Sequence, residues 1–200
     1  MPEWRLAEVP KYHTPEEVER VVHACQRDTA VARRDHAIIL LLARLGLRAG
    51  EVIALELEDI DWRAGVLKVR GKGRSHDSLP LPADVGEALA RYLRHHRPPC
   101  TTRRVFIRAR APHRGLAHPS SLSTLVGRAL RRAGLRTDFT GAHPLRHSLA
   151  TGMLRSGASL DEIGEILRHR SPNTTEIDAK VDIRGLRSLA LPWPLEGGER

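Results

Sequence analysis

Asp35-His36-Ala37-Ile38-Ile39-Leu40-Leu41-Leu42-Ala43-Arg44-Leu45 is apolar on nearly every side when it is wound into an α-helix. A helix that is hydrophobic all round belongs in the interior of a domain. Gly46 follows directly, and glycine is typical of the residue that ends a helix. We therefore expect a central helix with the rest of the chain packed around it.

The segments on either side of this helix carry their own helix signals. Thr14-Pro15-Glu16-Glu17 is a capping box, in which Thr14 and Glu17 satisfy free backbone N–H groups and Pro15 suits the first helical position. It predicts a helix from Thr14 to about Gln26. Further helical patterns begin near Ala49 and cover Ala83–His95, Ser120–Ala133, His143–Ser156, Leu160–Leu167 and Thr174–Leu189.

Three short runs that follow the helix at Ala49 are typical of β-strands. They are Leu57–Trp62, Val66–Arg70 and Ser78–Leu81, and the turns between them are residues 63–65 and 71–74. Turns this short join antiparallel neighbours. The predicted fold class is therefore mainly α with a small three-stranded antiparallel sheet, an α+β domain. Pro98-Pro99 and residues 108–119 are predicted loops.

Charge is the clearest feature of the composition. The chain has 200 residues, with 33 Lys plus Arg against 24 Asp plus Glu, so its formal charge is +9 before any of its 11 His is protonated. The excess is almost all arginine, whose planar guanidinium matches phosphate oxygens better than the point charge of lysine does. Nucleic acid is therefore the first partner to consider, and an anionic membrane surface is the second.

Other features of the composition exclude whole classes of protein. No apolar stretch is long enough to cross a bilayer, and the first five residues lack the parts of a secretory signal. The two cysteines, Cys25 and Cys100, are too few for a disulfide framework or a thiolate zinc site. We therefore expect a cytoplasmic protein of a reducing compartment, with no metal and no cofactor.

Short motifs contain the candidate functional residues, and each motif also has an ordinary structural explanation. Arg48 is followed three residues later by Glu51, a spacing that lets the acid orient the arginine or form a surface ion pair. Lys72 lies between two predicted strands, where it can reach a ligand or stay solvated. His143 and Arg146 share one helix face, which serves a common ligand or the structure alone.

A further motif, Leu167-Arg168-His169-Arg170, ends a predicted helix with basic residues. The helix dipole favours positive charge at that end in any case, so capping explains the motif as well as ligand binding does.

Together and in this order, these motifs resemble the catalytic domain of the tyrosine recombinases, the phage integrase family. The resemblance runs from about Arg5 to Pro194. The family order is an arginine in a Leu-Arg-x-x-Glu setting, a hairpin lysine, a His-x-x-Arg-His motif, a Gly-His or Arg-His pair, and a tyrosine just after Thr-Thr. The residues of this chain that fall in those places are Arg48, Lys72, His143, Arg146 and His169.

The resemblance implies the DNA breaking-rejoining fold and a division of the chain. It implies an integrase-like catalytic domain over residues 1–194 and a loose tail over residues 195–200. The family also carries a separate N-terminal core-binding domain, and we expect this chain to depart from the family by lacking it.

The resemblance also implies a reaction. In the family, the tyrosine hydroxyl attacks a DNA phosphodiester and forms a phosphotyrosyl bond with release of a 5′-hydroxyl, without a metal. Arg48 and Arg146 would then neutralise charge on the nonbridging oxygens. Lys72 would protonate the departing oxygen, and His143 would assist proton transfer on the nucleophile side.

Supporting roles follow from the same resemblance. His169 would donate a hydrogen bond to a phosphate oxygen. Glu51 and His147 would be orienting residues.

The last step of the pattern departs from the family. Asn173-Thr174-Thr175-Glu176-Ile177 is followed by Asp178 where the family has its tyrosine. A carboxylate is shorter than a phenol, the phosphate repels it, and its attack would give a mixed anhydride that water opens. The only tyrosines, Tyr12 and Tyr92, lie in segments that the family uses for other purposes. We therefore expect no cleavage of DNA by the chain as it stands.

Three functions are consistent with these residues. The first is the DNA-binding catalytic domain of a site-specific recombinase, acting in DNA integration and recombination. The second is a noncatalytic DNA-binding module derived from an integrase, and the third is a basic nucleic-acid-binding domain with no recombination role.

The expected partner is double-stranded DNA, at the bacterial nucleoid. The family exchanges its C-terminal segment between subunits, and residues 185–194 resemble that segment, so self-association on DNA is expected. No membrane and no small-molecule substrate are expected.

Overall fold

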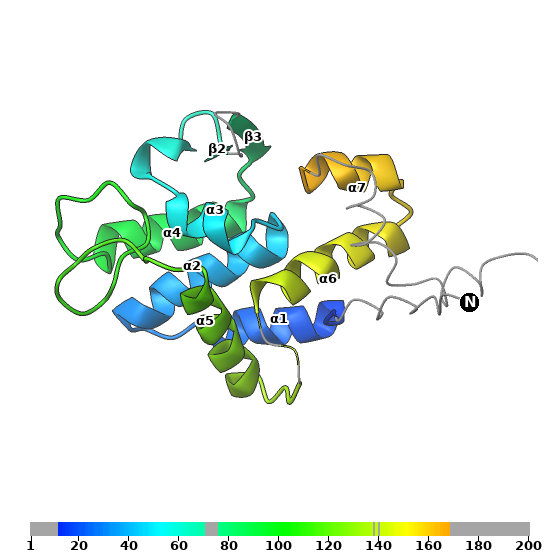
Figure 1. Cartoon of the computed structure of the whole chain (residues 1–200), viewed down its shortest axis with the longest axis horizontal. Helices are drawn as coiled ribbons and strands as arrows, with labels where there is room; N and C mark the ends of the chain where they lie inside the picture. Colours follow the sequence, from blue (N-terminus) through cyan, green and yellow to red (C-terminus); the bar gives the residue numbers. More distant parts are fainter. Residues whose placement is uncertain (1–11, 71–75, 138, 140, 169–200) are drawn as a thin grey trace, which may run out of the picture.

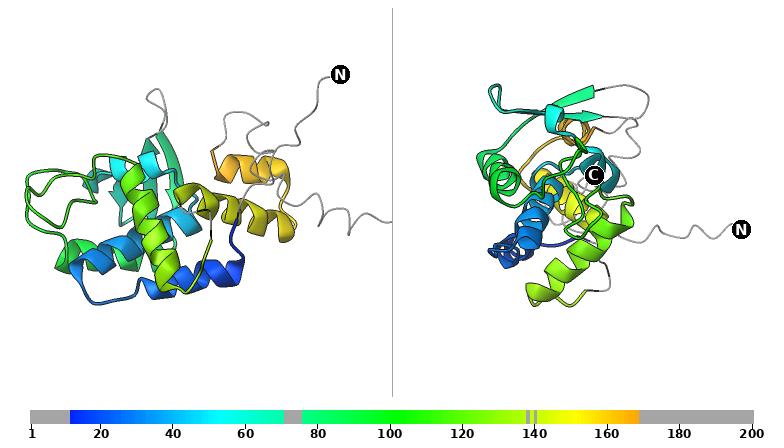
Figure 2. Two further views of the ribbon diagram at one scale, coloured as in Figure 1. Left: turned by 60° about the horizontal axis from the view of Figure 1, so that its bottom comes forward. Right: turned by 90° about the vertical axis from the view of Figure 1, so that its left-hand side faces the viewer.

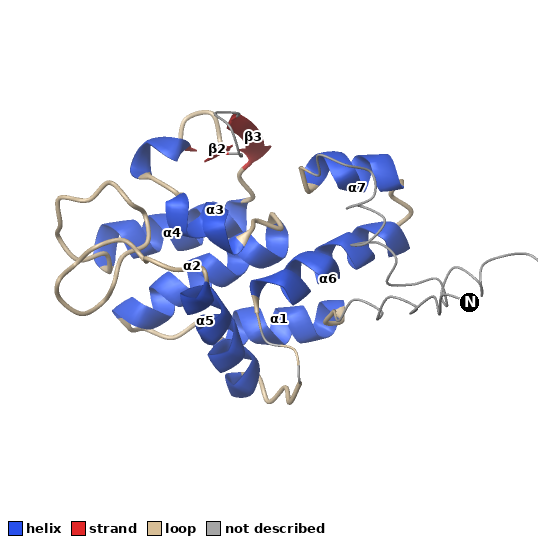
Figure 3. Cartoon of the chain, viewed as in Figure 1, coloured by secondary structure: helices blue, strands red, loops and turns tan. Residues whose placement is uncertain are grey.

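The computed structural model describes residues 12–70, 76–137, 139 and 141–168 (Figure 1). Helices make up most of these residues, and the strands lie together at one edge (Figure 3). This is the predicted fold class, mainly α with a small antiparallel sheet.

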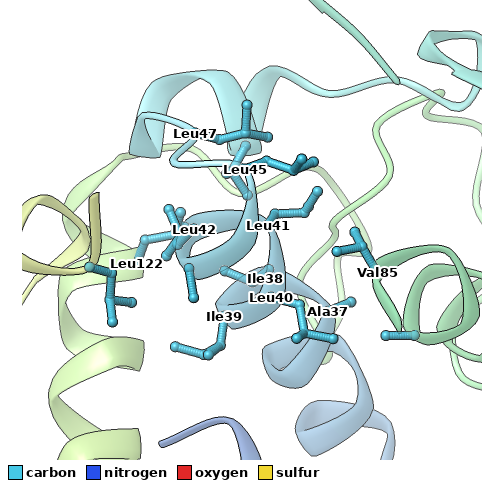
Figure 4. Close-up of a cluster of buried hydrophobic side chains, with 14 of the residues drawn as sticks. Ala37, Ile38, Ile39, Leu40, Leu41, Leu42, Leu45, Leu47, Val85 and Leu122 are labelled. Atoms are coloured by element: carbon cyan, nitrogen blue, oxygen red, sulfur yellow. The ribbon is translucent and has the colours of Figure 1, made fainter. Parts of the chain in front are cut away.

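Helix α2 (Ala30–Arg44) lies at the centre, as its apolar sequence predicts. Its buried side chains point in several directions around the helix, with Val85 on one side and Leu122 on the other (Figure 4). It begins five residues before the apolar run, because the hydroxyl of Thr29 caps it by accepting a hydrogen bond from the backbone N–H of Ala32 at 3.2 Å. This run contributes residues 37–43 and Leu45 to the hydrophobic core, and their removal from water favours the folded state.

Four helices pack around α2 or against its neighbours. They are α1 (Pro15–Ala24), α4 (Ala83–His95), α5 (Ser120–Arg132) and α6 (Ala142–Arg155). The predicted capping box at Thr14 is present, and α4 has the bounds that its sequence pattern predicts. The helices α5 and α6 begin and end within one residue of their predicted bounds.

Two short helices complete the described part. Helix α3 (Ala49–Ala54) follows the turn at Gly46, and α7 (Leu160–Ile166) packs on α6 through Ala150, Ile163 and Leu167. The sheet and α7 lie on the opposite side of α2 from α1 (Figures 1 and 2). The predicted helix over Thr174–Leu189 lies outside the described residues.

The sheet has the antiparallel order β1-β2-β3, with β1 (Ile60–Asp61), β2 (Val66–Arg70) and β3 (His76–Pro80). Leu67 of β2 lies opposite Leu79 of β3, and both side chains are buried on the same face. The inward side chains therefore alternate along β2 with exposed ones, as expected for a sheet with one covered face.

The prediction of a strand from Leu57 was wrong at its start. Leu57–Asp59 is a 3₁₀ helix, and only Ile60 and Asp61 pair with β2. The carboxylate of Asp59 accepts a hydrogen bond from the backbone N–H of Glu56 at 2.8 Å, which closes the turn locally. In the described part of the chain, no helix has the length and apolar character needed to cross a membrane.

Candidate functional site

A cavity of about 430 Å³ lies where the turn before α3 meets the first turns of α5 and α6. Arg48, His143 and Arg146 all line it, although they come from two segments nearly one hundred residues apart in sequence. The polar groups that α5 contributes are Ser120 and Ser123. The tertiary structure therefore brings together three of the residues that the motifs singled out.

Arg48 and Glu51 form the pair that their spacing predicts. Arg48 is the N-cap of α3, and its backbone N–H donates to Oε2 of Glu51 at 2.8 Å. Nη1 of Arg48 also donates to Oε1 of Glu51 at 2.9 Å. The arginine side chain is 42% exposed and the glutamate side chain 11%, so the acid lies behind and the cation faces outward.

Arg146 is held by the main chain on two sides. It is only 2% exposed, and its Nη1 and Nη2 donate to the carbonyl oxygens of Gly46 and Leu167. Gly46 ends the turn after α2, and Leu167 is the C-cap of α7. A planar guanidinium suits this task, because its fixed fork of donors can bridge two carbonyls at once.

His143 and His147 lie on the same side of α6. Their rings stack with centroids 5.6 Å apart and an angle of 26° between the planes. His143 is exposed at the cavity and His147 is half-buried.

Arg168 also contacts Glu51, and the sequence motifs assign it no role beyond the basic end of a helix. Its side chain is 7% exposed, and Nη2 donates to Oε2 of Glu51 at 2.8 Å. Nε lies 3.9 Å from Oδ2 of Asp77 in β3. The only sequence signal was its place next to His169, because its partners are far away along the chain.

Three predicted site residues lie outside the described part of the chain: Lys72, His169 and Asp178. The two strands that flank Lys72 in sequence, β2 and β3, do pair as an antiparallel hairpin. His169 follows Arg168 directly in sequence.

The electrostatics of the cavity favour an anion. Helices α5 and α6 have 13 and 14 residues, and their N-terminal residues line the cavity. Neither Pro119 nor Gly141, the two N-cap residues, makes a side-chain capping bond. The first N–H groups of a helix and its dipole attract negative charge, and here two arginines reinforce them. In the part of the chain that is described, no group of His, Cys, Asp or Glu side chains is arranged to hold a metal ion.

Comparison with known proteins gives the family. The phage integrase family matches residues 11–182. The protein y4rA of Sinorhizobium fredii, named as an integrase/recombinase, is 53% identical over 193 residues, which are 96% of this chain and 47% of that protein. This chain therefore spans about half the length of that relative.

Solved structures agree with the sequence comparison. A crystal structure of XerA recombinase has a TM-score of 0.77 and 27% identity, and the match covers 94% of this chain and 65% of that one. The XerH site-specific recombinase, bound to a palindromic difH substrate in a post-cleavage complex, has a TM-score of 0.77 and 26% identity over 91% of this chain and 53% of its own. The expected DNA breaking-rejoining fold is confirmed.

Proposed function

Because this chain belongs to the phage integrase family, we propose that it binds duplex DNA as the catalytic-type domain of a site-specific recombinase. The observation that carries the proposal is the convergence of Arg48, His143 and Arg146 on one cavity at the first turns of α5 and α6. A phosphodiester fits this arrangement, because guanidinium groups and helix N-termini are the groups that bind phosphate oxygens. The family match over residues 11–182 is consistent with one domain over residues 1–194, with a tail after it.

The residues have distinct roles in this proposal. Arg48 and Arg146 neutralise the nonbridging oxygens of the scissile phosphate. Glu51 orients Arg48, and its two hydrogen bonds to that residue support this role. His143 assists proton transfer on the nucleophile side, and His147 orients it.

Two further residues, both outside the described part of the chain, complete the proposed site. Lys72 protonates the departing oxygen, and His169 donates a hydrogen bond to a phosphate oxygen. The pairing of β2 with β3 supports a hairpin position for Lys72.

We propose that the chain as it stands binds DNA without cleaving it, because Asp178 occupies the place of the tyrosine in the sequence pattern. The negative charge of a carboxylate opposes its approach to a phosphate, and the anhydride it would form is short-lived in water. The other polar residues of the proposed site are all present in the sequence.

The test is covalent capture on a nicked suicide duplex, whose sequence is taken from the ends of the DNA element that encodes the chain. The chain as given and its Asp178→Tyr variant are compared on a denaturing gel, with Arg48→Ala and Arg146→Ala added in the tyrosine background. We expect an adduct with Asp178→Tyr alone, and loss of the adduct when either arginine is removed. An adduct that survives both arginine substitutions contradicts the assigned roles.

The noncatalytic module is the second candidate, and a groove favours it. A second cavity of about 440 Å³ runs between α1 and α6, and its apolar lining includes Val18, Leu145, Leu149 and Met153. The segment 185–194, with sequence GLRSLALPWP, supplies apolar side chains that suit such a groove. We propose that this segment of a second copy docks there and that the module pairs with active integrase chains on DNA.

This assembly is measurable by mass photometry on a duplex with two binding sites. Met153→Glu places a charge in the groove and is expected to reduce paired complexes to single ones. Leu160→Glu is the matched control, because Leu160 is an exposed apolar residue of α7 that does not line this groove. Equal pairing in both variants rejects the groove as the docking site.

A further inference from the structure

Arg168 has a backbone conformation that is unusual for its residue type. Its φ angle is +54°, and it is the only non-glycine residue with a positive φ among the residues that the structure describes. This is the left-handed region, where the Cβ atom of an L-residue crowds the backbone. Residues held there against this crowding are frequently kept for function.

The other helices of this chain show what the position normally takes. The second residue after the end of α2, α5 and α6 is glycine in each case, with φ of +56° at Gly46, +73° at Gly134 and +91° at Gly157. Arg168 occupies the same position after α7. Glycine is the usual residue at this point of a helix end, so the arginine is there in spite of the backbone.

The side chain of Arg168 supplies the reason. It is 7% exposed, its Nη2 donates to Oε2 of Glu51 at 2.8 Å, and its Nε lies 3.9 Å from Oδ2 of Asp77. It therefore joins three elements: the end of α7, the first turn of α3, and strand β3. The hydrogen bond from Arg146 to the carbonyl of Leu167 holds the same turn from the opposite side.

Glu51 is shared between two arginines. Its Oε1 accepts from Nη1 of Arg48, and its Oε2 accepts from the backbone of Arg48 and from Arg168. Arg168 therefore offsets the negative charge of Glu51 and of Asp77, the two carboxylates that it pairs with beside Arg48. Without Arg168, the two carboxylates would outnumber Arg48, and this group of side chains would attract a phosphate much less.

We propose that Arg168 is a positioning residue, which holds Glu51 so that Arg48 keeps its orientation toward a bound phosphate, and which offsets the charge of the two carboxylates beside Arg48. The inference rests on the proposed function, because it assigns Arg168 a part in binding DNA. Arg168 acts through Glu51, and its ion pair with Asp77 fixes β3 to the same cluster.

The experiment is a double-mutant cycle between Arg48→Ala and Arg168→Gly. Glycine suits the backbone of this position, so the variant removes the guanidinium without adding strain. Binding to a fluorescent duplex of about 30 base pairs at constant salt gives the dissociation constants, and thermal unfolding checks that each variant is folded. We expect Arg168→Gly to weaken binding about tenfold, and Arg48→Ala to have less than about a third of its wild-type effect in that background.

Two further variants separate positioning from simple loss of charge. Arg94→Gln removes an exposed arginine of α4. We expect the factors by which Arg94→Gln and Arg48→Ala weaken DNA binding to multiply in the double variant, as they do for independent sites. Arg168→Lys keeps the charge near Glu51, so it is expected to restore most of the dependence on Arg48.

The outcomes separate the role of Arg168 from the proposed function of the chain in binding DNA. If the wild-type chain binds DNA and the effects of Arg48→Ala and Arg168→Gly on affinity simply multiply, the role of Arg168 is overturned. The role is also overturned if Arg168→Lys behaves like Arg168→Gly. A wild-type chain that does not bind duplex DNA overturns the proposed function, and the role of Arg168 with it. Coupling of about threefold or more, with rescue by lysine, supports the inference.

Discussion

Arg146 donates a buried hydrogen bond to the main-chain carbonyl of Gly46, which lies 100 residues earlier in the chain. A second donor of the same guanidinium reaches the carbonyl of Leu167. The turn after α2 and the turn after α7 are therefore tied to α6 by one side chain, and the residues that follow the first of these turns, Leu47 and Arg48, line the candidate site. Arg146 contributes to the fold as well as to the proposed phosphate site.

Arg146→Met is expected to lower the free energy of unfolding by about 2–4 kcal/mol, because it leaves two buried carbonyl groups without their donors. Arg146→Lys should lose less, since it keeps a charge but cannot bridge both carbonyls. Urea denaturation measures the loss. Arg48→Met is the control: its side chain is 42% exposed, and its loss should stay within about 1 kcal/mol. Equal losses for the two arginines would contradict the assigned structural role.

Gly46→Ala is expected to destabilise the fold for two reasons. The φ angle of Gly46 is +56°, and an added Cβ would lie 2.6 Å from Cδ2 of Leu167. Gly65→Ala is the matched control, because it adds only the backbone strain. The φ angle of Gly65 is +65°, and no atom lies within 4 Å of the new Cβ. We expect a loss of about 1 kcal/mol at Gly65 and about 1–3 kcal/mol more at Gly46. Equal effects in thermal unfolding would show that the contact with Leu167 relaxes freely.

Stability should fall as the pH is lowered through the range in which histidine titrates. Burial lowers the pKa of His36 below its ordinary value of 6.5, and the nearby Arg33 and Arg91 add to the effect. Burial also lowers the pKa of His13. Near and below about pH 6.5 the unfolded chain therefore binds more protons than the folded one, so the free energy of unfolding decreases on acidification.

The measurement is urea denaturation at about pH 7.5 and about pH 5.5, on either side of the ordinary histidine pKa. His36→Leu removes this titrating ring, whose Nε2 has no hydrogen-bond partner among the described residues. The free energy of unfolding of the variant should therefore depend less on pH than that of the wild type. A pH dependence equal to that of the wild type would show that His36 does not contribute.

The basic loop, defined here as residues 108–114, is expected to contact DNA phosphates beside the cavity. Its base is closed by the bridge between Ile107 and Gly115, and the chain continues from it into the first turn of α5. Arg108, Arg110 and Arg114 are exposed, and no ion pair among the described residues includes them.

Replacing these three arginines by glutamine should reduce the salt dependence of DNA affinity. On duplex DNA the slope of log affinity against log salt changes by about 0.9 for each phosphate that the protein no longer neutralises. The control is Arg91→Gln with Arg94→Gln, because α4 lies on the opposite side of α2 from α5 (Figure 4). A slope that changes by the same amount per arginine removed in both sets would indicate a general charge effect.

The two cysteines should react at very different rates with a thiol reagent. Cys25 is 1% exposed, and burial raises its pKa to about 11, so it presents almost no thiolate at neutral pH. Cys100 is partly exposed. We expect one thiol to react in the folded chain and the second only on unfolding, as followed by absorbance and by mass spectrometry. Rapid reaction of Cys25 would show local opening between α1 and α2.

Features with a local cause could be predicted from the sequence. The apolar run of α2, the capping box at Thr14 and the bounds of β2 and α4 agree with the structure, because periodicity and capping act within a few residues. The strand expected from Leu57 failed because the carboxylate of Asp59 forms a local turn that competes with strand pairing.

For the site, the sequence alone determined the pair of Arg48 with Glu51, because a separation of three residues at a helix start brings them together in any fold that forms the helix. Only the tertiary structure decided that Arg168 reaches the same glutamate across 117 residues, and that Arg146 donates hydrogen bonds to two carbonyl groups that are distant in sequence. Contacts of this kind depend on how α6 and α7 pack against the turn after α2. That packing is the joint result of all the buried side chains, and no short stretch of sequence specifies it.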